Sequence, residues 1–382
     1  MSYASQRQST VDTFDVREFD LSGLESSHIE AWTNLSRKPA YGEWFAGPNW
    51  ILPLSKTYFA DSSLALQFVY SGSSLVGVIP LVSQSTGHRA GLGFPINSQV
   101  RRIGAVGDLP LGVLFDVVVA DLKRRGRAHE IAFGQIPREG ALHNAIVSSC
   151  RRNGLGYFLR EESRSAIADF SGGWDAYLSA LDGRHLSTLR KQRKMERSGL
   201  WDTRTFHSPA LIELGWSSLL DIERQSWKHS NGTSIANEPG ALEFYKAVSS
   251  LCARDAMLRL HISYREQFPV AHTLGVVHNG IYYLLKNSFA EAFKAWSPGL
   301  LLVWHVMKEC AEEGITHFDF LGDAIPWKLD YATQLPTYES ITAFSPLNVR
   351  GQFSRLAESM LKPLARRLRV KEAFSRLSRR PS

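Results

Sequence analysis

The sequence predicts an α/β protein made of two similar units and a basic helical tail. The main observation is that β-rich runs, one amphipathic helix and a short strand follow one another twice along the 382 residues. The apolar fraction of 44% and the charged fraction of 21% are those of a globular protein. A chain of this length is also long enough for two domains.

The first unit begins with a predicted β-hairpin. Two β-rich runs lie within residues 64–83 and flank the sequence SGSS at 71–74, which is typical of a tight turn. A glycine-rich stretch follows, and the apolar pattern of residues 111–126 predicts a helix. The run HEIAFGQIP at residues 129–137 predicts the strand that ends this unit.

The second unit repeats this order. Residues 257–289 predict three strands, with turns near 265–267 and 278–280. Apolar residues then recur every three to four positions, which predicts a helix over 299–314 that ends at a glycine. The sequence THFDFLG at 316–322 predicts the closing strand.

Between the two units, residues 175–199 predict a helix with a basic face. Arg190, Arg193, Lys194 and Arg197 fall on this face, and leucines occupy the opposite one. One interpretation is a solvated helix that packs through its leucines. The other is a basic rim for an anionic ligand, such as nucleotide phosphates or tRNA.

Several function classes lack their motifs. The chain has no G-x-S-x-G nucleophile elbow, no complete G-x-G-x-x-G and no Walker lysine motif, which disfavours hydrolase, dehydrogenase and NTPase interpretations. The twelve histidines show no metal-ligand spacing. Cys150, Cys252 and Cys310 are far apart, so we expect buried, reduced thiols in a cytoplasmic protein.

The positive charge of the chain is concentrated at its C-terminal end. Residues 350–382 hold ten Lys or Arg and two Glu, a net +8 against +7 for the whole chain. The near-neutral body argues against nucleic acid as a partner. Apolar residues recur through 353–377, which is typical of a basic amphipathic segment. Contact with an anionic membrane surface, a helix docked on its own domain and contact with RNA remain alternatives.

The ordered set of motifs resembles a known family. The sequences SWKHSNG (226–232), SPGLLL (297–302) and FDFLGDAIPWK (318–328), together with the strand run 257–289, are similar to BioF2-like, CelD-like acyltransferases of the GNAT superfamily. These proteins are relatives of the Fem-type aminoacyltransferases. The first half resembles the degenerate GNAT-like domain of that family through HIEAWTNLSRKP, the 66–81 hairpin and EIAFGQIP.

The resemblance implies tandem GNAT-like domains, each a mixed central sheet flanked by helices. The expected limits are a degenerate GNAT-like domain over 15–165 and an acyltransferase domain over 166–345. A flexible N-terminus (1–14) and a basic amphipathic helical tail (346–382) are expected outside them. No apolar run is long enough to span a bilayer, and residues 1–16 do not have the pattern of a signal peptide.

The resemblance also implies acyl-CoA as a cosubstrate, no permanently bound cofactor or metal, and an amine as the acceptor. The start of the helix at 297–300 offers unpaired N–H groups to a pyrophosphate. Ser297 can cap this helix, Pro298 fits its first turn and Gly299 permits close approach, with Leu300 next along the backbone. Typical GNAT loops have two glycines at this place, whereas this chain has one.

Further site residues are expected around these positions. The candidate bases are His272, Asp319 and Glu223, because acyl transfer to an amine requires removal of a proton. The resemblance places a carbonyl-binding N–H within 282–287, so Asn287 is expected near the cofactor, as is Lys294. The residues expected at the substrate are Trp227, Tyr283, Lys328, Arg190 and Arg193, and a structural Asp319–Lys328 salt bridge remains an alternative.

The acceptor is left open by the sequence. The tail favours a long acyl chain transferred to a lipid amine at the cytoplasmic face of the inner membrane, as in the bacterial ceramide synthases that N-acylate a sphingoid base. The alternatives are an exopolysaccharide-associated acetyltransferase, a Fem-like enzyme that uses aminoacyl-tRNA, and a non-catalytic degenerate GNAT factor. The short helix over 175–199 lacks the coiled-coil arm of the Fem type.

Overall fold

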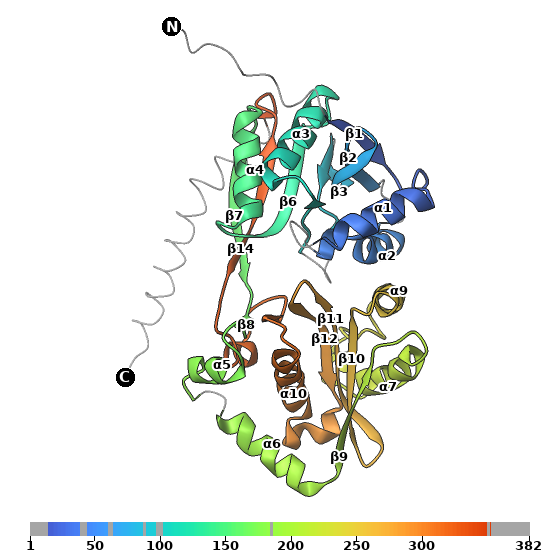
Figure 1. Ribbon diagram of the computed structural model, residues 1–382, viewed down its shortest axis with the longest axis vertical. Coiled ribbons are helices and arrows are strands. Elements are labelled where there is room, and N and C mark those ends of the chain that lie inside the picture. Colours follow the sequence, from blue (N-terminus) through green and yellow to red (C-terminus); the bar gives the residue numbers. More distant parts are fainter. Residues whose placement is uncertain are drawn as a thin grey trace, which may run out of the picture.

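The structure, a computed structural model, describes residues 14–38, 44–59, 64–86, 89–96, 102–183, 186–349 and 352. Two mixed β-sheets form two domains, which lie one above the other in Figure 1. This arrangement confirms the predicted fold class. The predicted N-terminus (residue 14 excepted) and most of the predicted tail (346–349 and 352 excepted) lie outside the described residues.

The first sheet has eight strands in the order β1-β2-β3-β4-β6-β14-β7, and β5 pairs with β3. Its strands are β1 (Asp15–Phe19), β2 (Leu64–Ser71), β3 (Ser74–Thr86), β4 (Arg89–Gly93), β5 (Val106–Gly107), β6 (Glu130–Pro137), β7 (Gly156–Arg164) and β14 (Thr337–Phe344). The predicted hairpin is confirmed, because β2 and β3 are joined by a tight turn at Gly72, which has a φ of 61°.

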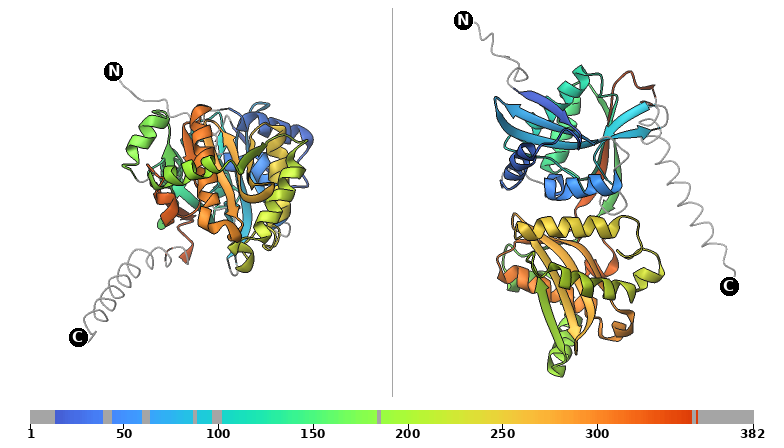
Figure 2. Two further views of the ribbon diagram at one scale, coloured as in Figure 1. Left: turned by 90° about the horizontal axis from the view of Figure 1, so that it is seen from below. Right: turned by 90° about the vertical axis from the view of Figure 1, so that its right-hand side faces the viewer.

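Helices cover both faces of the first sheet (Figure 2). The helices α1 (Ser26–Ser36) and α2 (Pro48–Tyr58), with the short η2 (Trp44–Ala46), lie on one face, where Trp32 contacts Phe68. The helices α3 (Leu111–Arg124) and α4 (Ala141–Arg152) lie on the other face. A helix and strand were predicted at the positions of α3 and β6, and both are present.

The second sheet has six strands in the order β8-β13-β12-β11-β10-β9. Its strands are β8 (Ile167–Asp169), β9 (Trp201–Phe206), β10 (Leu258–Arg265), β11 (Phe268–His278), β12 (Ile281–Phe289) and β13 (His317–Asp319). Among these described strands, β12 and β13 are the pair that runs parallel, and the other pairs are antiparallel. The three strands predicted over 257–289 are therefore present, with both predicted turns.

One long helix covers one face of the second sheet, and two helices cover the other. On the first face, α10 (Pro298–Glu312) packs its apolar side on Tyr282 and Leu284. On the second face, α7 (Ile212–Arg224) and α9 (Ala241–Arg254) pack on Leu274 and Val276. The shorter helices are α5 (Trp174–Ala180), α6 (Leu186–Ser198), α8 (Trp227–Ser230), η3 (Glu291–Trp296) and α11 (Pro326–Leu329).

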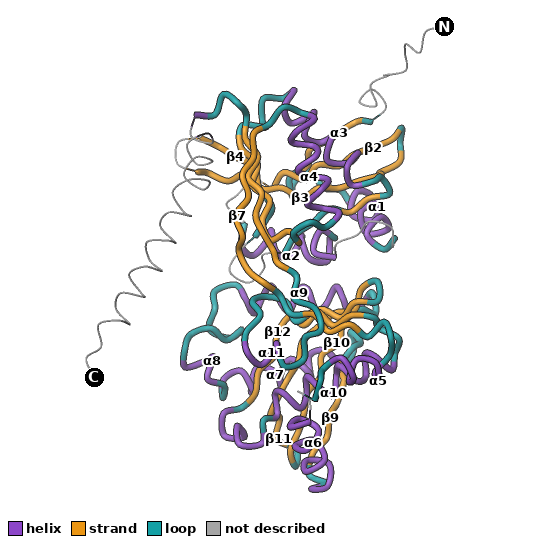
Figure 3. Tube along the Cα trace, turned by 90° about the vertical axis from the view of Figure 1, so that its left-hand side faces the viewer, coloured by secondary structure: helices purple, strands orange, loops and turns teal. Residues whose placement is uncertain are grey.

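The chain crosses between the two sheets twice, and Figure 3 shows both crossings side by side. It leaves the first sheet through β7 and enters the second through β8. It returns after α11, and β14 then inserts between β6 and β7. The Ser165 N–H donates to the Pro336 carbonyl at 3.1 Å between the two crossings. The last strand of the predicted second domain (166–345) thus completes the first sheet.

The two domains share apolar contacts. The core of the first domain is continuous with the α7 and α9 face of the second sheet, and Tyr283 contacts Trp44 and Phe45 across the boundary. The three cysteines are free and buried, as expected. Within the described residues, no helix has the length and apolar character needed to cross a membrane.

Candidate active site between the two domains

The site begins where the two parallel strands of the second sheet part. Pairing between β12 and β13 ends at Tyr283 and Asp319. A β-bulge lies one residue further along β12, because Gly275 of β11 opposes Leu284 and Leu274 opposes Lys286. The extra residue, Leu285, has no partner in the register with β11.

Gly275 allows close packing beside this bulge. A Cβ atom at position 275 would lie 2.3 Å from the Tyr282 ring, so any side chain there would collide with it. The Tyr282 ring is fully buried and stacks on Phe318 of β13, with ring centroids 4.6 Å apart. The close packing of one glycine and two aromatic rings therefore fixes β12 against β13 just before the strands part.

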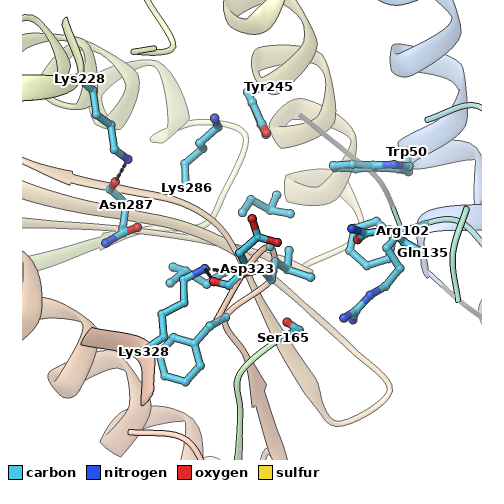
Figure 4. A pocket seen from close by; sticks show the side chains of 16 residues that line it. Trp50, Arg102, Gln135, Ser165, Lys228, Tyr245, Lys286, Asn287, Asp323 and Lys328 are labelled. Carbon is cyan, nitrogen blue, oxygen red and sulfur yellow. Dashed lines mark hydrogen bonds between the residues drawn. The ribbon is translucent and has the colours of Figure 1, made fainter. Parts of the chain in front are cut away.

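A cavity of about 300 Å³ lies at this parting (Figure 4). One wall consists of residues 284–287 of β12 and residues 320–323, which follow β13. The opposite wall comes from the first domain and contains Phe45, Trp50 and Arg102. Both domains are therefore needed to form the cavity.

Three lysines line the cavity, and burial destabilises the charged form of each. Burial, together with the charge of Lys228, lowers the pKa of Lys286 to about 8. Burial also lowers the pKa of Lys328 to about 8, although Asp319 and Asp323 act in the opposite direction. Burial lowers the pKa of Lys228 in the same way.

Two of these lysines bind backbone carbonyls. The Lys228 Nζ donates to the Asn287 carbonyl at 2.5 Å. The Lys328 Nζ donates to the carbonyls of Leu321 and Asp323 at 2.5 and 3.1 Å, which fixes the loop after β13. Lys328 therefore lines the cavity, and its amino group holds the loop. Its predicted contact with the substrate stays a prediction.

Asp319 is buried and bound on both sides. It forms an ion pair with Arg102 of the first domain, which also donates to the Tyr338 hydroxyl. The second Asp319 oxygen accepts the Leu321 N–H at 2.9 Å. Lys328 forms no ion pair with Asp319, so the alternative of a structural Asp319–Lys328 salt bridge is wrong. Asp319 joins the two domains at the cavity and does not line it.

His272 and Glu223 lie together behind the cavity wall. The Glu223 Oε1 is 2.8 Å from the His272 Nε2, and the second Glu223 oxygen accepts the Ile235 N–H at 3.1 Å. Burial opposes ionisation of Glu223, but the hydrogen bond and charge of His272 keep the pKa of Glu223 below its usual value. Burial lowers the pKa of His272. Neither side chain lines the cavity, so their predicted role as bases stays a prediction.

Asp323 is the acidic side chain that the cavity does contain. It lies in the loop after β13, is exposed to solvent, and extends into the cavity in Figure 4. Asp323 is not among the residues predicted from the sequence, although GDAIPWK places it one position after Gly322 and five before Lys328. The sequence feature that could have identified Asp323 is its place as a carboxylate between a predicted strand and a short helix.

The helix start predicted to bind phosphate lies next to the basic helix. Ser297 is the N-cap residue of α10, but its side chain makes no capping hydrogen bond, contrary to prediction. Its hydroxyl instead accepts from the Lys191 Nζ at 3.0 Å. The Lys194 Nζ lies 5.2 Å from the centre of the Trp296 ring. The helix α6 thus brings positive charge to the N-terminus of α10.

The helix start is only partly open to a ligand, because the Leu300 N–H is already bonded. Pro298 occupies the first turn, and the N–H groups of Leu300 and Leu301 donate to the Ser297 carbonyl. In the part of the chain that the structure describes, no bond is found for the Gly299 N–H. A Cβ atom at Gly299 would lie 3.0 Å from the Phe289 ring, so this residue is also packed closely.

The remaining predicted residues are scattered. Asn287 lines the cavity. Tyr283 packs at the domain boundary, whereas Trp227 is 48% exposed at the start of α8. Lys294 is exposed and pairs with Glu291 at 3.0 Å. Arg190 is exposed on α6, and the side chain of Arg193 lies outside what the structure describes.

A comparison with protein families finds a match in the second half of the chain. Residues 184–329 match a family model described as an acetyltransferase (GNAT) domain. The matched segment includes α6, the parted strands β12 and β13, the start of α10 and the described cavity residues of the second domain. Residues 184–329 are therefore similar to a GNAT acetyltransferase domain. No curated protein sequence matches the chain.

Solved structures with the same fold cover most of the chain. The C-terminal domain of a putative lysylphosphatidylglycerol synthetase from Agrobacterium fabrum aligns at a TM-score of 0.54 with 14% identity, over 87% of this chain and 94% of that one. FemX aligns at 0.56 with 12% identity, over 87% and 98%. A protein of unknown function from Bacteroides thetaiotaomicron aligns at 0.54 with 13% identity, over 87% and 100%. The chain thus shares their fold.

Proposed function

We propose that this protein is an acyl-CoA-dependent N-acyltransferase that works in the cavity between its two domains. The observation that supports this proposal is the parting of β12 and β13 beside the α10 N-terminus, within the segment that matches the GNAT model. The gap offers a thioester access to backbone N–H groups, and the helix terminus offers its pyrophosphate a positive site.

The donor lies along α10 and between the parted strands. The Gly299 N–H binds the pyrophosphate, while Lys191 and Lys194 contribute charge from α6. The bulge at Leu285 leaves β12 backbone groups outside the regular ladder, and these groups polarise the thioester carbonyl. Asn287 lies on the same stretch of β12.

The acceptor enters from the side of the first domain. Its amine nitrogen attacks the carbonyl carbon, the C–S bond breaks, and the products are an amide and the coenzyme thiol. Asp323 accepts the amine proton, because its carboxylate extends into the cavity. The Lys328 ammonium holds the carbonyl of the same residue at 3.1 Å and so positions it.

The transfer of a long acyl chain to a lipid amine, such as a sphingoid base, at the membrane surface remains part of this proposal. Leu347 and Val349 are 88% and 67% exposed, and they lie at the start of the predicted amphipathic tail. Exposed apolar side chains followed by a basic segment suit an anionic bilayer surface. If full-length protein and protein truncated at residue 349 bound anionic vesicles equally, the tail would have no such role.

Calorimetric titration tests the donor. The full-length protein is titrated with acyl-CoA of several chain lengths and with tRNA, which is the donor in the Fem-like alternative. We expect acyl-CoA to bind and tRNA not to bind. If no thioester binds, the proposal fails, and the non-catalytic alternative gains support.

Release of free thiol from acyl-CoA in the presence of amines tests the chemistry. We expect Asp323→Asn to lower kcat by about 100-fold, with little change in acyl-CoA affinity, because a general base contributes a factor of that order. Asp221→Asn is the matched control, since Asp221 is exposed on α7 and pairs only with Arg224 among the described contacts. Equal turnover of the Asp323 and Asp221 variants would exclude Asp323 as the base.

A further inference from the structure

We propose that the acceptor carries an oxyanion, a carboxylate or a phosphate ester, close to its reacting amine, and that Lys286 binds this oxyanion with Lys228 beside it. The inference rests on the proposed acyl transfer for the role of the amine. The anion site itself rests on the geometry of the cavity. A free sphingoid base has no such group, so the site favours an acidic amine over it.

Lys286 differs from the other two cavity lysines in the contacts of its ammonium group. Lys228 and Lys328 bind backbone carbonyls, whereas Lys286 forms no hydrogen bond or ion pair with any part of the chain that the structure describes. Its amino group lies 5.2 Å from the centre of the Tyr245 ring, and Figure 4 shows it between Tyr245 and Lys228. A half-buried ammonium without a partner is costly, and a bound anion removes that cost.

The acidic groups near Lys286 do not serve as its ion-pair partner. Glu223 and Glu238 attract the charge of Lys286, but neither forms an ion pair with it. Glu223 is occupied by His272 and by the Ile235 N–H. Among the described residues, the cavity wall has four basic side chains and one acidic side chain, Asp323, which is assigned to the amine proton.

Lys286 lies on the side of the second sheet that α9 covers. The bulge at Leu285 shifts the alternation of β12, so that Lys286 faces α9 and Tyr245. Trp50 of the first domain also lines the cavity. The donor occupies the α10 side of the parted strands, so the oxyanion that Lys286 binds belongs to the acceptor.

Binding of small probes in the absence of acyl-CoA tests the anion site. The full-length protein is titrated with three acidic amines, glycine, phosphoethanolamine and glycerophosphoethanolamine, and with two neutral counterparts, glycinamide and ethanolamine. We expect at least one acidic amine to bind at least about tenfold more tightly than its counterpart. The acidic amine that binds best distinguishes a carboxylate, a phosphate monoester and the phosphodiester of a lipid headgroup.

Variants of the lysine give the decisive comparison. We expect Lys286→Met to weaken binding of the preferred probe by about 10- to 100-fold, as for loss of a charge-assisted bond. Lys286→Arg is expected to retain most of the affinity. Lys308→Met, on the exposed side of α10, serves as the control and leaves affinity unchanged. Melting temperatures show whether each variant is folded.

The two proposals fail in different ways. If the neutral amines bind as tightly as the acidic ones, or if Lys286→Met binds the acidic probes as wild type does, the anion site is wrong. If the acidic probes bind through Lys286 but no acyl-CoA is consumed with any amine, the anion site stands and the proposed acyl transfer fails.

Discussion

The Glu223 Oε1 lies 2.8 Å from the His272 Nε2, and the two side chains are 1% and 0% exposed. The pKa of Glu223 is lowered, so its carboxylate is charged and accepts the Nε2 proton of a neutral His272. In the described part of the chain the His272 Nδ1 has no partner. This pair links α7 to β11 directly behind the cavity wall that Lys228 forms.

Because of this pair, we expect the protein to become less stable as the pH falls. The pKa of His272 is lower in the folded protein than its ordinary value of about 6.5, so the unfolded chain binds more protons just below pH 6.5. The depressed pKa of Glu223 acts in the same direction below about pH 4.5. The free energy of unfolding should therefore decrease from pH 7 to pH 4.

Denaturant titrations at several pH values measure this loss. In His272→Gln, which keeps a donor for Glu223, the decrease that begins below pH 6.5 should become smaller, and the part that burial of His278 and His305 causes should remain. The decrease below pH 4.5 should also become smaller, because the charge of His272 that lowers the pKa of Glu223 is lost. Glu213→Gln, an exposed change on the same helix, should leave the whole profile unchanged. A profile that is the same in His272→Gln and wild type would contradict the neutral histidine.

Lys286, in contrast, is predicted to destabilise the folded protein while its amino group is charged. Its pKa is about 8 in the folded protein and about 10.5 when unfolded, so the folded state holds the proton less well. Lys286→Met should therefore raise the free energy of unfolding at pH 7 by about 1–2 kcal/mol, part of the gain being offset by loss of the Tyr245 contact.

The pH dependence provides the check. The gain from Lys286→Met should be complete below pH 8, shrink between pH 8 and 10.5, and vanish above that range, because the wild-type lysine is then neutral in both states. The exposed change Lys308→Met should show no such trend. A stability loss in Lys286→Met at pH 7 would show that the ammonium has a partner in the folded protein.

The order of strands and helices was predictable because the local patterns are strong. The hairpin at Gly72, the helix α10 and the three strands β10–β12 each follow from periodicity and turn residues. The place of β14 was not predictable, since a strand that returns to the first sheet has the same local pattern as one that stays in the second. Which strands pair depends on packing between residues far apart in the chain, and the local sequence pattern of a strand does not reveal it.

The site was only partly predictable for the same reason. Asn287 and Lys328 line the cavity, and both lie on motifs of the second domain. Arg102 and Trp50 come from the first domain, and no local pattern relates them to β12. His272 was singled out as a polar residue in an apolar strand, and this pattern fits a buried partner of Glu223 as well as it fits a base.

The ion pair between Arg102 and Asp319 predicts a coupling of stability between the domains. Both side chains are almost buried, so removing one partner leaves an uncompensated charge. Arg102→Met should lower the free energy of unfolding by about 3 kcal/mol, and Asp319→Asn should have a similar effect. Tyr338→Phe should cost only about 1 kcal/mol, since it removes one hydrogen bond.

An exposed pair gives the comparison for this prediction. Arg37 and Asp255 also connect the two domains, at 2.7 Å, but the Arg37 side chain is 56% exposed. Arg37→Met should cost less than about 1 kcal/mol. Chemical denaturation followed by tryptophan fluorescence measures all four variants. If Asp319→Asn kept full stability and lost turnover, Asp319 would act as the predicted base and not as a structural partner.

We expect the close packing at Gly275 to affect the shape of the cavity. In Gly275→Ala the new methyl group would meet the Tyr282 ring, which cannot move because it stacks on Phe318. The cost of such overpacking is about 1–3 kcal/mol, and relief of the clash would shift the bulge at Leu285. Both the free energy of unfolding and the affinity for acyl-CoA should therefore fall.

Two further variants separate this effect from a general glycine effect. Gly112→Ala lies in α3, where the added methyl group has space, so it should stabilise the protein slightly. Adding Tyr282→Leu to Gly275→Ala should cost less than the sum of the two single changes, because the smaller side chain removes the clash. Additive costs in the double mutant would mean that the Tyr282 ring is not what requires a glycine at position 275.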